Sequence, residues 1–302
     1  MKFTYSIIIP HKNTPKLLQR CLDSIPQRED LEVIVIDDNS DPEIVDFDNF
    51  PGKDRQDTTI IFDKCGKGAG RARNVGLEHV KGKWLLFADA DDYFYPEAFF
   101  ELDKLKDSDY DIVYFYCNSR DGKTGELIPD RGPYIKRGID TLDYDLLRYK
   151  SYSPWGKLIK RKLVYLNHLT FDEVIASNDV MFSTKAGHYA KKISTISTPL
   201  YCTTKNEWSL VYSPDINKIK SRIKVASRLN DFLYQHRLQR YRQYGIKWIY
   251  YFFPKHPLLL MWAIFKLRYK GDNILYLRML KRGLSNKIRT LNNSKKYRLS
   301  KD

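Results

Sequence analysis

The sequence lacks several features that would place it in a common functional class. Its four cysteines form no CxxC pair, which argues against a disulfide framework or a zinc site and favours reduced, buried thiols. The six histidines include no HxxxH pair, the spacing of a helical zinc-hydrolase motif. The chain also has no internal repeat. These absences leave a reduced, cytosolic globular protein as the expectation.

Long apolar runs are missing as well. The N-terminus, MKFTYSIIIPHKN, has an apolar run too short for a signal peptide, and Pro10, His11 and Lys12 interrupt it at once. No run approaches the ~20 apolar residues that would span a bilayer. We therefore expect the protein to be made in the cytoplasm and to stay there.

Charge is present but unevenly distributed. The 302 residues carry a formal charge of +15, yet residues 215–302 alone hold 22 Lys and Arg against four Asp, a charge of +18. The remaining residues are close to neutral, at −3. This predicts a body over 1–214 and a basic, aromatic-rich, helical region over 215–302. The tail from about 287 is polar without apolar periodicity, and we expect it to be mobile.

The first 120 residues alternate between two kinds of apolar pattern. Short runs rich in Ile, Val and aromatics predict buried strands at 5–9, 31–36, 59–62, 84–88 and 112–116. Apolar residues at helical spacing predict helices at 17–24, 70–80 and 97–105. This alternation predicts an α/β fold with a mainly parallel sheet flanked by helices. Ligands bind at the carboxyl ends of such strands, and three of those ends are polar here.

Beyond residue 120 the patterns are shorter. The expected elements are a hairpin or loop over 122–136, a helix over 137–150, a Pro- and Gly-containing turn over 153–160, a helix over 179–189, and two short strands over 192–196 and 200–204 on either side of Pro199.

The segment Asp89-Ala90-Asp91-Asp92 follows the apolar run WLLFA. Three carboxylates within four residues repel one another unless a cation or hydrogen bonds intervene. Carboxylate oxygens at a strand end suit Mg²⁺ or Mn²⁺. The alternative is a polar turn that caps the next helix, for which one Asp would suffice. We favour the metal site.

Two further polar segments lie after predicted strands. In VIVIDDNS, Asp37 or Asp38 could accept hydrogen bonds from a base or ribose, or could close an Asx-turn. In CGKGAGRARNVGL, glycines and cations precede a helix and would attract a diphosphate, although a plain flexible loop is the alternative. The glycines do not match a dinucleotide fingerprint, because Arg73 occupies the sixth position of GxGxxG.

Taken in order, SIIIPHKN, VIVIDDNS, GAGRARNVGL and WLLFADADDYF resemble family-2 glycosyltransferases with the GT-A fold, of the type that builds bacterial capsules and exopolysaccharides. The resemblance covers about residues 4–214. It implies inverting transfer of a sugar from a nucleotide-diphosphate donor, usually UDP-activated. The residues that it places around the nucleotide-sugar are Pro10, His11, Asn13, Asp37, Asp38, Arg73 and Asp89. Asp89 and Asp91 match the family's DxD pair, with Asp91 the direct ligand of Mn²⁺ or Mg²⁺.

The resemblance continues downstream with a departure. ASNDVMF is similar to the family's Glu-Asp segment, which implies that Asp179 is the catalytic base, but Asn178 stands where the family has Glu. The alternative for Asp179 is a helix cap. SPWGKLIKR implies that Trp155 lies under the sugar, against the alternative of a core Trp. LYCTTKNEWSL resembles a loop that closes over the diphosphate, with Lys205 as a phosphate contact.

The basic region contains WIYYFFPKHPLLLMWAIF at 248–265, flanked by lysines and arginines. It is too short to span a bilayer, but it suits peripheral contact with an anionic membrane through 247–270. Such contact fits a glycan or polyprenyl-linked acceptor at the inner face of the cell membrane. The alternatives are packing against protein and, less favoured, nucleic acid, for which no recognisable module is present.

Two other functional classes share part of this pattern of residues. A sugar-nucleotide nucleotidyltransferase also pairs a metal with a nucleotide, but such enzymes usually carry a Gly-rich first turn, and HKNTPK has no Gly. A non-catalytic binder of nucleotide-sugars or nucleic acid would not need the DxD pair together with Asp179. The glycosyltransferase interpretation is therefore preferred.

Overall fold

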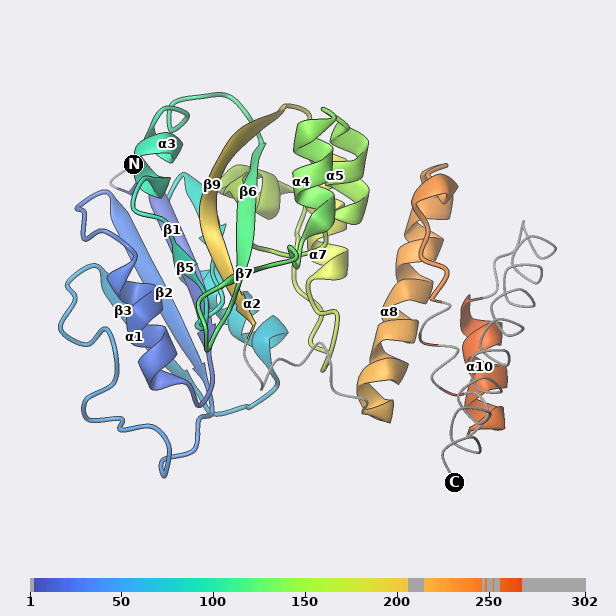
Figure 1. Cartoon of the computed structure of the whole chain (residues 1–302), viewed down its shortest axis with the longest axis horizontal. Coiled ribbons are helices and arrows are strands. Elements are labelled where there is room, and N and C mark those ends of the chain that lie inside the picture. The colour runs from blue at the N-terminus through green and yellow to red at the C-terminus, as the bar shows by residue number, and fades with distance from the viewer. Residues whose placement is uncertain (1–2, 206–214, 246–247, 249–251, 253–255, 268–302) are drawn as a thin grey trace, which may run out of the picture. The chain divides into compact units, whose positions relative to one another are not determined.

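The computed structural model describes residues 3–205, 215–245, 248, 252 and 256–267. The chain divides into two compact units, residues 1–213 and 214–302. The first unit is built on one nine-stranded sheet in the order β3-β2-β1-β4-β8-β6-β9-β5, with β7 paired to β6 (Figure 1). The predicted α/β class is confirmed.

The N-terminal half of the sheet is parallel throughout. Its strands are β1 Tyr5–His11, β2 Leu31–Asp38, β3 Thr58–Asp63 and β4 Trp84–Phe87. All residues of β2 and β4 are buried, which explains their nearly continuous apolar sequences. Two helices connect the strands: α1 Pro15–Asp23 and α2 Ala69–His79, of which α2 packs against β1 and β2.

The second half of the sheet is mixed. Its strands are β5 Tyr93–Phe94, β6 Ile112–Asp121, β7 Leu127–Ile128, β8 Lys157–Lys160 and β9 Ile193–Lys205. Only β6 and β9 pair in parallel, and β8 joins the two halves by antiparallel pairing with both β4 and β6. The helices here are α3 Ala98–Asp103, α4 Pro133–Asp140, α5 Tyr144–Lys150, α6 Arg161–Leu166 and α7 Val180–Tyr189.

Three local predictions in this half are wrong. The helix expected over 137–150 is two helices, because Leu142 has a φ of +51° and the Asp143 carboxylate caps α5 by accepting from the Leu146 amide. The turn expected over 153–160 includes strand β8. The two strands expected around Pro199 are one strand, β9, whose register against β6 shifts near Pro199, so the irregularity is absorbed without ending the strand.

The second unit is described by itself. It contains α8 Ile216–Gln235, a short 3₁₀ turn η2 Gln239–Tyr241, and α10 Pro257–Leu267. Buried residues from α8 and α10 form a small apolar cluster with Phe252. Among the residues that the structure describes, no helix has the length and apolar character needed to cross a bilayer. The tail from about 287, expected to be mobile, lies outside the described residues.

Candidate functional site

The candidate site lies where β1, β2 and β4 end. In the parallel register, His11 at the end of β1 lies opposite Asp37 at the end of β2, and β4 is followed by Ala88 and then Asp89. Pro10 precedes His11 within β1, so its side chain shares this edge of the sheet. The three polar strand ends in the sequence predict this convergence.

His11 and Asp37 are both buried and form an internal network. The His11 Nε2 accepts from the Thr14 amide at 3.1 Å, which places the ring proton on Nδ1, and Nδ1 donates to Asp37 Oδ2 at 2.8 Å. Ser40 donates to the same carboxylate from its hydroxyl at 2.6 Å and from its amide at 2.9 Å. Burial raises the pKa of Asp37, but the hydrogen bonds from His11 and Ser40 outweigh it and hold that pKa below its ordinary value. Asp37 therefore stabilises the loops that surround the site.

Asp38 and Asn13 join adjacent loops. Both carboxylate oxygens of Asp38 lie 3.0 Å from the Gly68 amide, and Lys12 Nζ lies 3.5 Å from Asp38 Oδ2. The Asn13 side-chain oxygen accepts from the Asp41 amide at 2.8 Å, and Asn13 has a φ of +54°. Asp38 thus connects the end of β2 to the glycine-rich turn at the start of α2.

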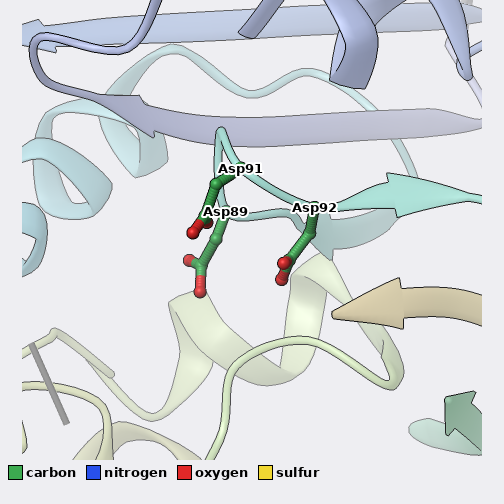
Figure 2. Close-up of side chains that lie close together, drawn as sticks. All are labelled: Asp89, Asp91 and Asp92. Atoms are coloured by element: carbon green, nitrogen blue, oxygen red, sulfur yellow. The ribbon is translucent and has the colours of Figure 1, made fainter. Parts of the chain in front are cut away.

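Three carboxylates gather in the loop after β4. Ligand oxygens of Asp89, Asp91 and Asp92 all lie within 4.8 Å of one another, and Figure 2 shows the side chains extending from this loop. Asp92 is buried and bonded internally, with its Oδ1 accepting from the Thr204 amide at 2.7 Å and its Oδ2 from the Tyr201 hydroxyl at 3.0 Å. Burial, together with the charges of Asp91 and Asp89, raises the pKa of Asp92 well above its ordinary value.

This acidic group fits a hard divalent cation. Mg²⁺ and Mn²⁺ prefer carboxylate oxygens and are commonly held by one or two of them together with substrate phosphates. The hydrogen bonds of Asp92 to β9 assign that residue to holding the loop, which leaves Asp89 and Asp91 as the candidate ligands. The role of Asp92 was not predicted, because its partners on β9 are more than 100 residues away in the sequence.

Arg73 connects this acidic loop to the segment before α7. Its Nη2 donates to Asp89 Oδ1 at 2.6 Å, and its Nη1 donates to Asn178 Oδ1 at 2.9 Å. Only 5% of Arg73 is exposed, and its guanidinium lies 5.4 Å from the ring centroid of Phe171. One buried cation therefore contacts both polar segments of the site.

Asp179 lies at the N-cap position of α7. Among the described residues its side chain makes no capping hydrogen bond, so the geometry gives no support to the alternative that this carboxylate serves as a cap. Burial raises the pKa of Asp179, and the neighbouring charge of Arg73 opposes that rise. A carboxylate with a raised pKa is a stronger base than an exposed one, provided that it is ionised at the working pH.

The structure does not test the roles predicted for Trp155 and Lys205. Trp155 is buried and stacks on Tyr201, with ring centroids 6.2 Å apart. Lys205 is exposed at the end of β9, and the segment that follows it lies outside the described residues. The predicted contacts of Trp155 with sugar and of Lys205 with phosphate stay predictions.

Sequence reasoning missed a buried lysine beside the site. Lys157 opens β8, is 1% exposed, and donates to the carbonyl oxygens of Ser151, at 2.9 Å, and of Ser153. Burial lowers the pKa of Lys157 to about 7, against the opposing charge of Asp179. The signal was present in SPWGKLIK, where the lysine begins a short apolar strand.

Comparison with known proteins identifies a family and a fold. The model of the family described as Glycosyl transferase family 2 matches residues 6–165, more than half of the chain. Among solved structures, S. aureus TarS 1–349 in complex with UDP-GlcNAc aligns with a TM-score of 0.61 at 21% identity, covering 94% of this chain and 92% of that one. The GT-A expectation is confirmed at the level of fold.

The curated relatives include larger proteins. The poly(ribitol-phosphate) beta-glucosyltransferase of Bacillus spizizenii is 31% identical over 200 residues, covering 63% of this chain and 30% of that protein. The uncharacterized glycosyltransferase EpsJ of Bacillus subtilis is 25% identical over 257 residues, covering 80% of this chain and 70% of its own. This chain thus spans only about a third of the first of these relatives.

The Asp37 network predicts a pH-dependent loss of stability. Asp37→Ala removes the acceptor for three buried hydrogen bonds and should lower the free energy of unfolding by about 2–4 kcal/mol at pH 7. Because the native pKa is lowered, this contribution is present above the ordinary value of 3.8 and is lost as pH falls through the native pKa. Urea unfolding followed by circular dichroism should show this difference in unfolding free energy between the parent and Asp37→Ala at pH 7, and a smaller difference near pH 3.

Exposed Glu43 provides the control for this prediction. Glu43→Gln should stay within about 0.5 kcal/mol of the parent at both pH values. The assignment of Asp37 as an ionised structural acceptor would be contradicted if Asp37→Ala were as stable as the parent at pH 7. It would also be contradicted if their difference in unfolding free energy did not become smaller in acid.

Proposed function

The chain belongs to glycosyl transferase family 2, and we propose that it transfers a sugar from a nucleoside-diphosphate sugar, with UDP as the nucleotide, to a hydroxyl group of a growing polysaccharide. The observation that carries this proposal is the meeting of an acidic pair, a buried arginine and a half-buried acid of raised pKa at one edge of the sheet. These groups match the requirements of the reaction: a site for a diphosphate and a base for a hydroxyl.

The donor would bind at the ends of β1, β2 and β4. The loops around Pro10, Asn13 and Asp38 would border the base and ribose, with His11 and Asp37 holding those loops from within. TarS structures with UDP-GlcNAc and with UDP support a nucleotide-sugar donor for this fold. Donor binding at strand ends is also the general rule for open α/β sheets.

The diphosphate is negatively charged and needs positive charge beside it. Because residues 1–214 are close to neutral overall, this charge would come from groups at the site itself. Asp89 and Asp91 would hold Mg²⁺ or Mn²⁺, which would neutralise the diphosphate and stabilise its charge as it leaves. Arg73, already fixed beside Asp89, would add the second positive charge at the same place. The proposed enzyme therefore depends on a divalent metal.

Asp179 would act as the general base. Its carboxylate would take the proton from an acceptor hydroxyl as that oxygen forms a bond to the anomeric carbon, while the bond from this carbon to the diphosphate oxygen breaks and its electron pair leaves with UDP. A single displacement from the opposite face inverts the anomeric configuration and needs one base and no covalent nucleophile. The absence of a capping hydrogen bond among the described residues supports this role for Asp179.

The acceptor would be a glycan or polyprenyl-linked glycan at the inner face of the cell membrane. Three apolar side chains at helical spacing on α10 are largely exposed: Leu258 at 80%, Met261 at 69% and Phe265 at 70%. The surrounding basic sequence would attract anionic lipid, with about 1 kcal/mol for each Lys or Arg near the surface. We therefore propose that the protein works in the cytoplasm, with no role for nucleic acid, and contacts the membrane peripherally through residues 247–270, of which the structure describes 248, 252 and 256–267.

The base assignment predicts a specific catalytic defect. Asp179→Asn should lower turnover by about 10²- to 10⁴-fold, because an amide cannot accept the acceptor proton. UDP affinity should stay within about threefold, since the carboxylate faces the acceptor in this mechanism. Asp143→Asn is the matched control, because Asp143 is the N-cap of α5. Normal UDP release from a UDP-sugar by Asp179→Asn would remove Asp179 from this role.

The metal assignment predicts a binding defect. Asp91→Ala should weaken UDP binding in the presence of Mn²⁺ by about tenfold or more, towards the affinity without metal. Isothermal titration calorimetry with and without Mn²⁺ measures this directly, and Asp107→Ala, at an exposed carboxyl, serves as the control. An unchanged Mn²⁺-dependent affinity in Asp91→Ala would exclude Asp91 as a ligand.

The membrane assignment predicts that the full chain floats with vesicles that contain anionic lipid, and does so less at high salt. Replacing Leu258, Met261 and Phe265 together by Ser should reduce flotation. The matched control replaces Phe100, Leu127 and Leu166, which are exposed on the catalytic unit. Equal flotation of the two triple variants, or binding to RNA in place of vesicles, would contradict the assignment.

A further inference from the structure

The guanidinium of Arg73 forms a bridge between two segments of the candidate site. Its two terminal nitrogens bind groups from different parts of the chain: Asp89 Oδ1 in the loop after β4, and Asn178 Oδ1 immediately before Asp179. Asn178 is also the position where the chain departs from the Glu-Asp pattern. The bridge therefore joins the proposed metal loop to the residue that directly precedes the proposed base.

The segment that carries Asn178 is packed closely on α2. A side chain at Gly70 would place its Cβ 2.1 Å from the Asp172 carbonyl oxygen and 3.0 Å from Asn178 Cβ, so only glycine allows this approach. The Asp172 amide donates to the Asn178 carbonyl at 3.0 Å, which closes the segment into a loop. Its position relative to α2 is therefore narrowly defined.

The start of the same segment is fixed as well. The Asn74 side chain, one residue after Arg73 on α2, accepts from the Phe171 amide at 2.8 Å and donates to the Phe171 carbonyl at 3.0 Å. Phe171 in turn lies beneath the Arg73 guanidinium. The loop is thus held on α2 at Phe171 and at Asn178, and Asp179 is the next residue along the chain.

We propose that Asn178 is a positioning residue for the transfer reaction: its amide oxygen holds Arg73 and thereby sets Asp179 relative to Asp89. This inference rests on the proposed function, because it assigns Asp179 and Asp89 the roles given above. Asn178 itself touches neither donor nor acceptor in this account. It acts through Arg73.

The neutrality of the amide is part of the proposal. A carboxylate at 178 could also accept from Arg73, but it would compete with Asp89 for the same cation. It would also add a negative charge beside Asp179 and near the diphosphate site. An amide oxygen supplies the acceptor without the charge, so Arg73 keeps its charge paired with Asp89.

Two substitutions at position 178 distinguish the effect of losing the hydrogen-bond acceptor from the effect of adding a charge. Asn178→Leu keeps the approximate size and removes the acceptor, and Asn178→Asp keeps the acceptor and adds a charge. We expect Asn178→Leu to lower kcat by about 100-fold with a donor KM within about threefold, because the base is displaced from its productive position. Asn178→Asp should recover most of that loss, to within about tenfold of the parent.

Asn167→Leu is the matched control, because Asn167 is a half-buried asparagine with one side-chain hydrogen bond, to the Leu163 carbonyl, at the end of α6. It should leave kcat within about twofold of the parent. Mn²⁺-dependent UDP binding, measured by calorimetry, should be unchanged in Asn178→Leu and Asn167→Leu and weaker in Asn178→Asp, because the added charge lies near the diphosphate site.

Hydrogen exchange of residues 172–183 provides a readout that does not need turnover. We expect faster exchange in Asn178→Leu than in the parent, and near-parent exchange in Asn178→Asp. The proposal is overturned if the kcat of Asn178→Leu stays within threefold of the parent, or if this variant loses UDP affinity as severely as turnover. It is also overturned if the kcat of Asn178→Asp is no higher than that of Asn178→Leu. If the parent releases no UDP from any UDP-sugar, the proposed function fails, and the exchange comparison still decides whether Asn178 holds this segment.

Discussion

Carboxylates brought together in a partly buried site repel one another, and this site gathers Asp89, Asp91, Asp92 and Asp179 near one edge of the sheet. The ion pair between Arg73 and Asp89 places a positive charge among these carboxylates and offsets part of their repulsion. Because Arg73 is buried and also bonded to Asn178, it compensates charge and fixes geometry at the same time. The proposed metal and base positions both follow from it.

Environment divides the acids of the site into two groups. Asp37 and Asp92 are buried and have protein donors on their oxygens, so they hold loops: Asp37 those after β1 and β2, and Asp92 the acidic loop against β9. Asp89 and Asp91 sit in the loop that Asp92 holds, and Asp179 accepts no cap bond among the described residues. Burial and hydrogen-bond partners thus distinguish the two loop-holding aspartates from the three for which we propose metal binding and proton transfer.

Much of this could be predicted from the sequence where the signal is local. The buried parallel strands can be predicted because their sequences are apolar runs. The polar residues that follow these runs indicate the position of the candidate site. The Arg73–Asn178 and Tyr201–Asp92 contacts join residues 105 and 109 positions apart, which no local pattern reveals. The division of α4 from α5 depends on one residue, Leu142, in a left-handed conformation, and the course of β9 past Pro199 depends on its pairing with β6.

Identification of the leaving product tests the central claim most directly. The parent protein is incubated with a panel of UDP-sugars and Mn²⁺, with a glycan or polyprenyl-linked acceptor, and separately with UTP and sugar phosphates. A glycosyltransferase built on the Arg73–Asp89 pair and the Asp179 base should release UDP from at least one UDP-sugar and depend on the metal. Release of pyrophosphate from UTP without UDP release from any UDP-sugar would contradict the account and indicate nucleotidyl transfer.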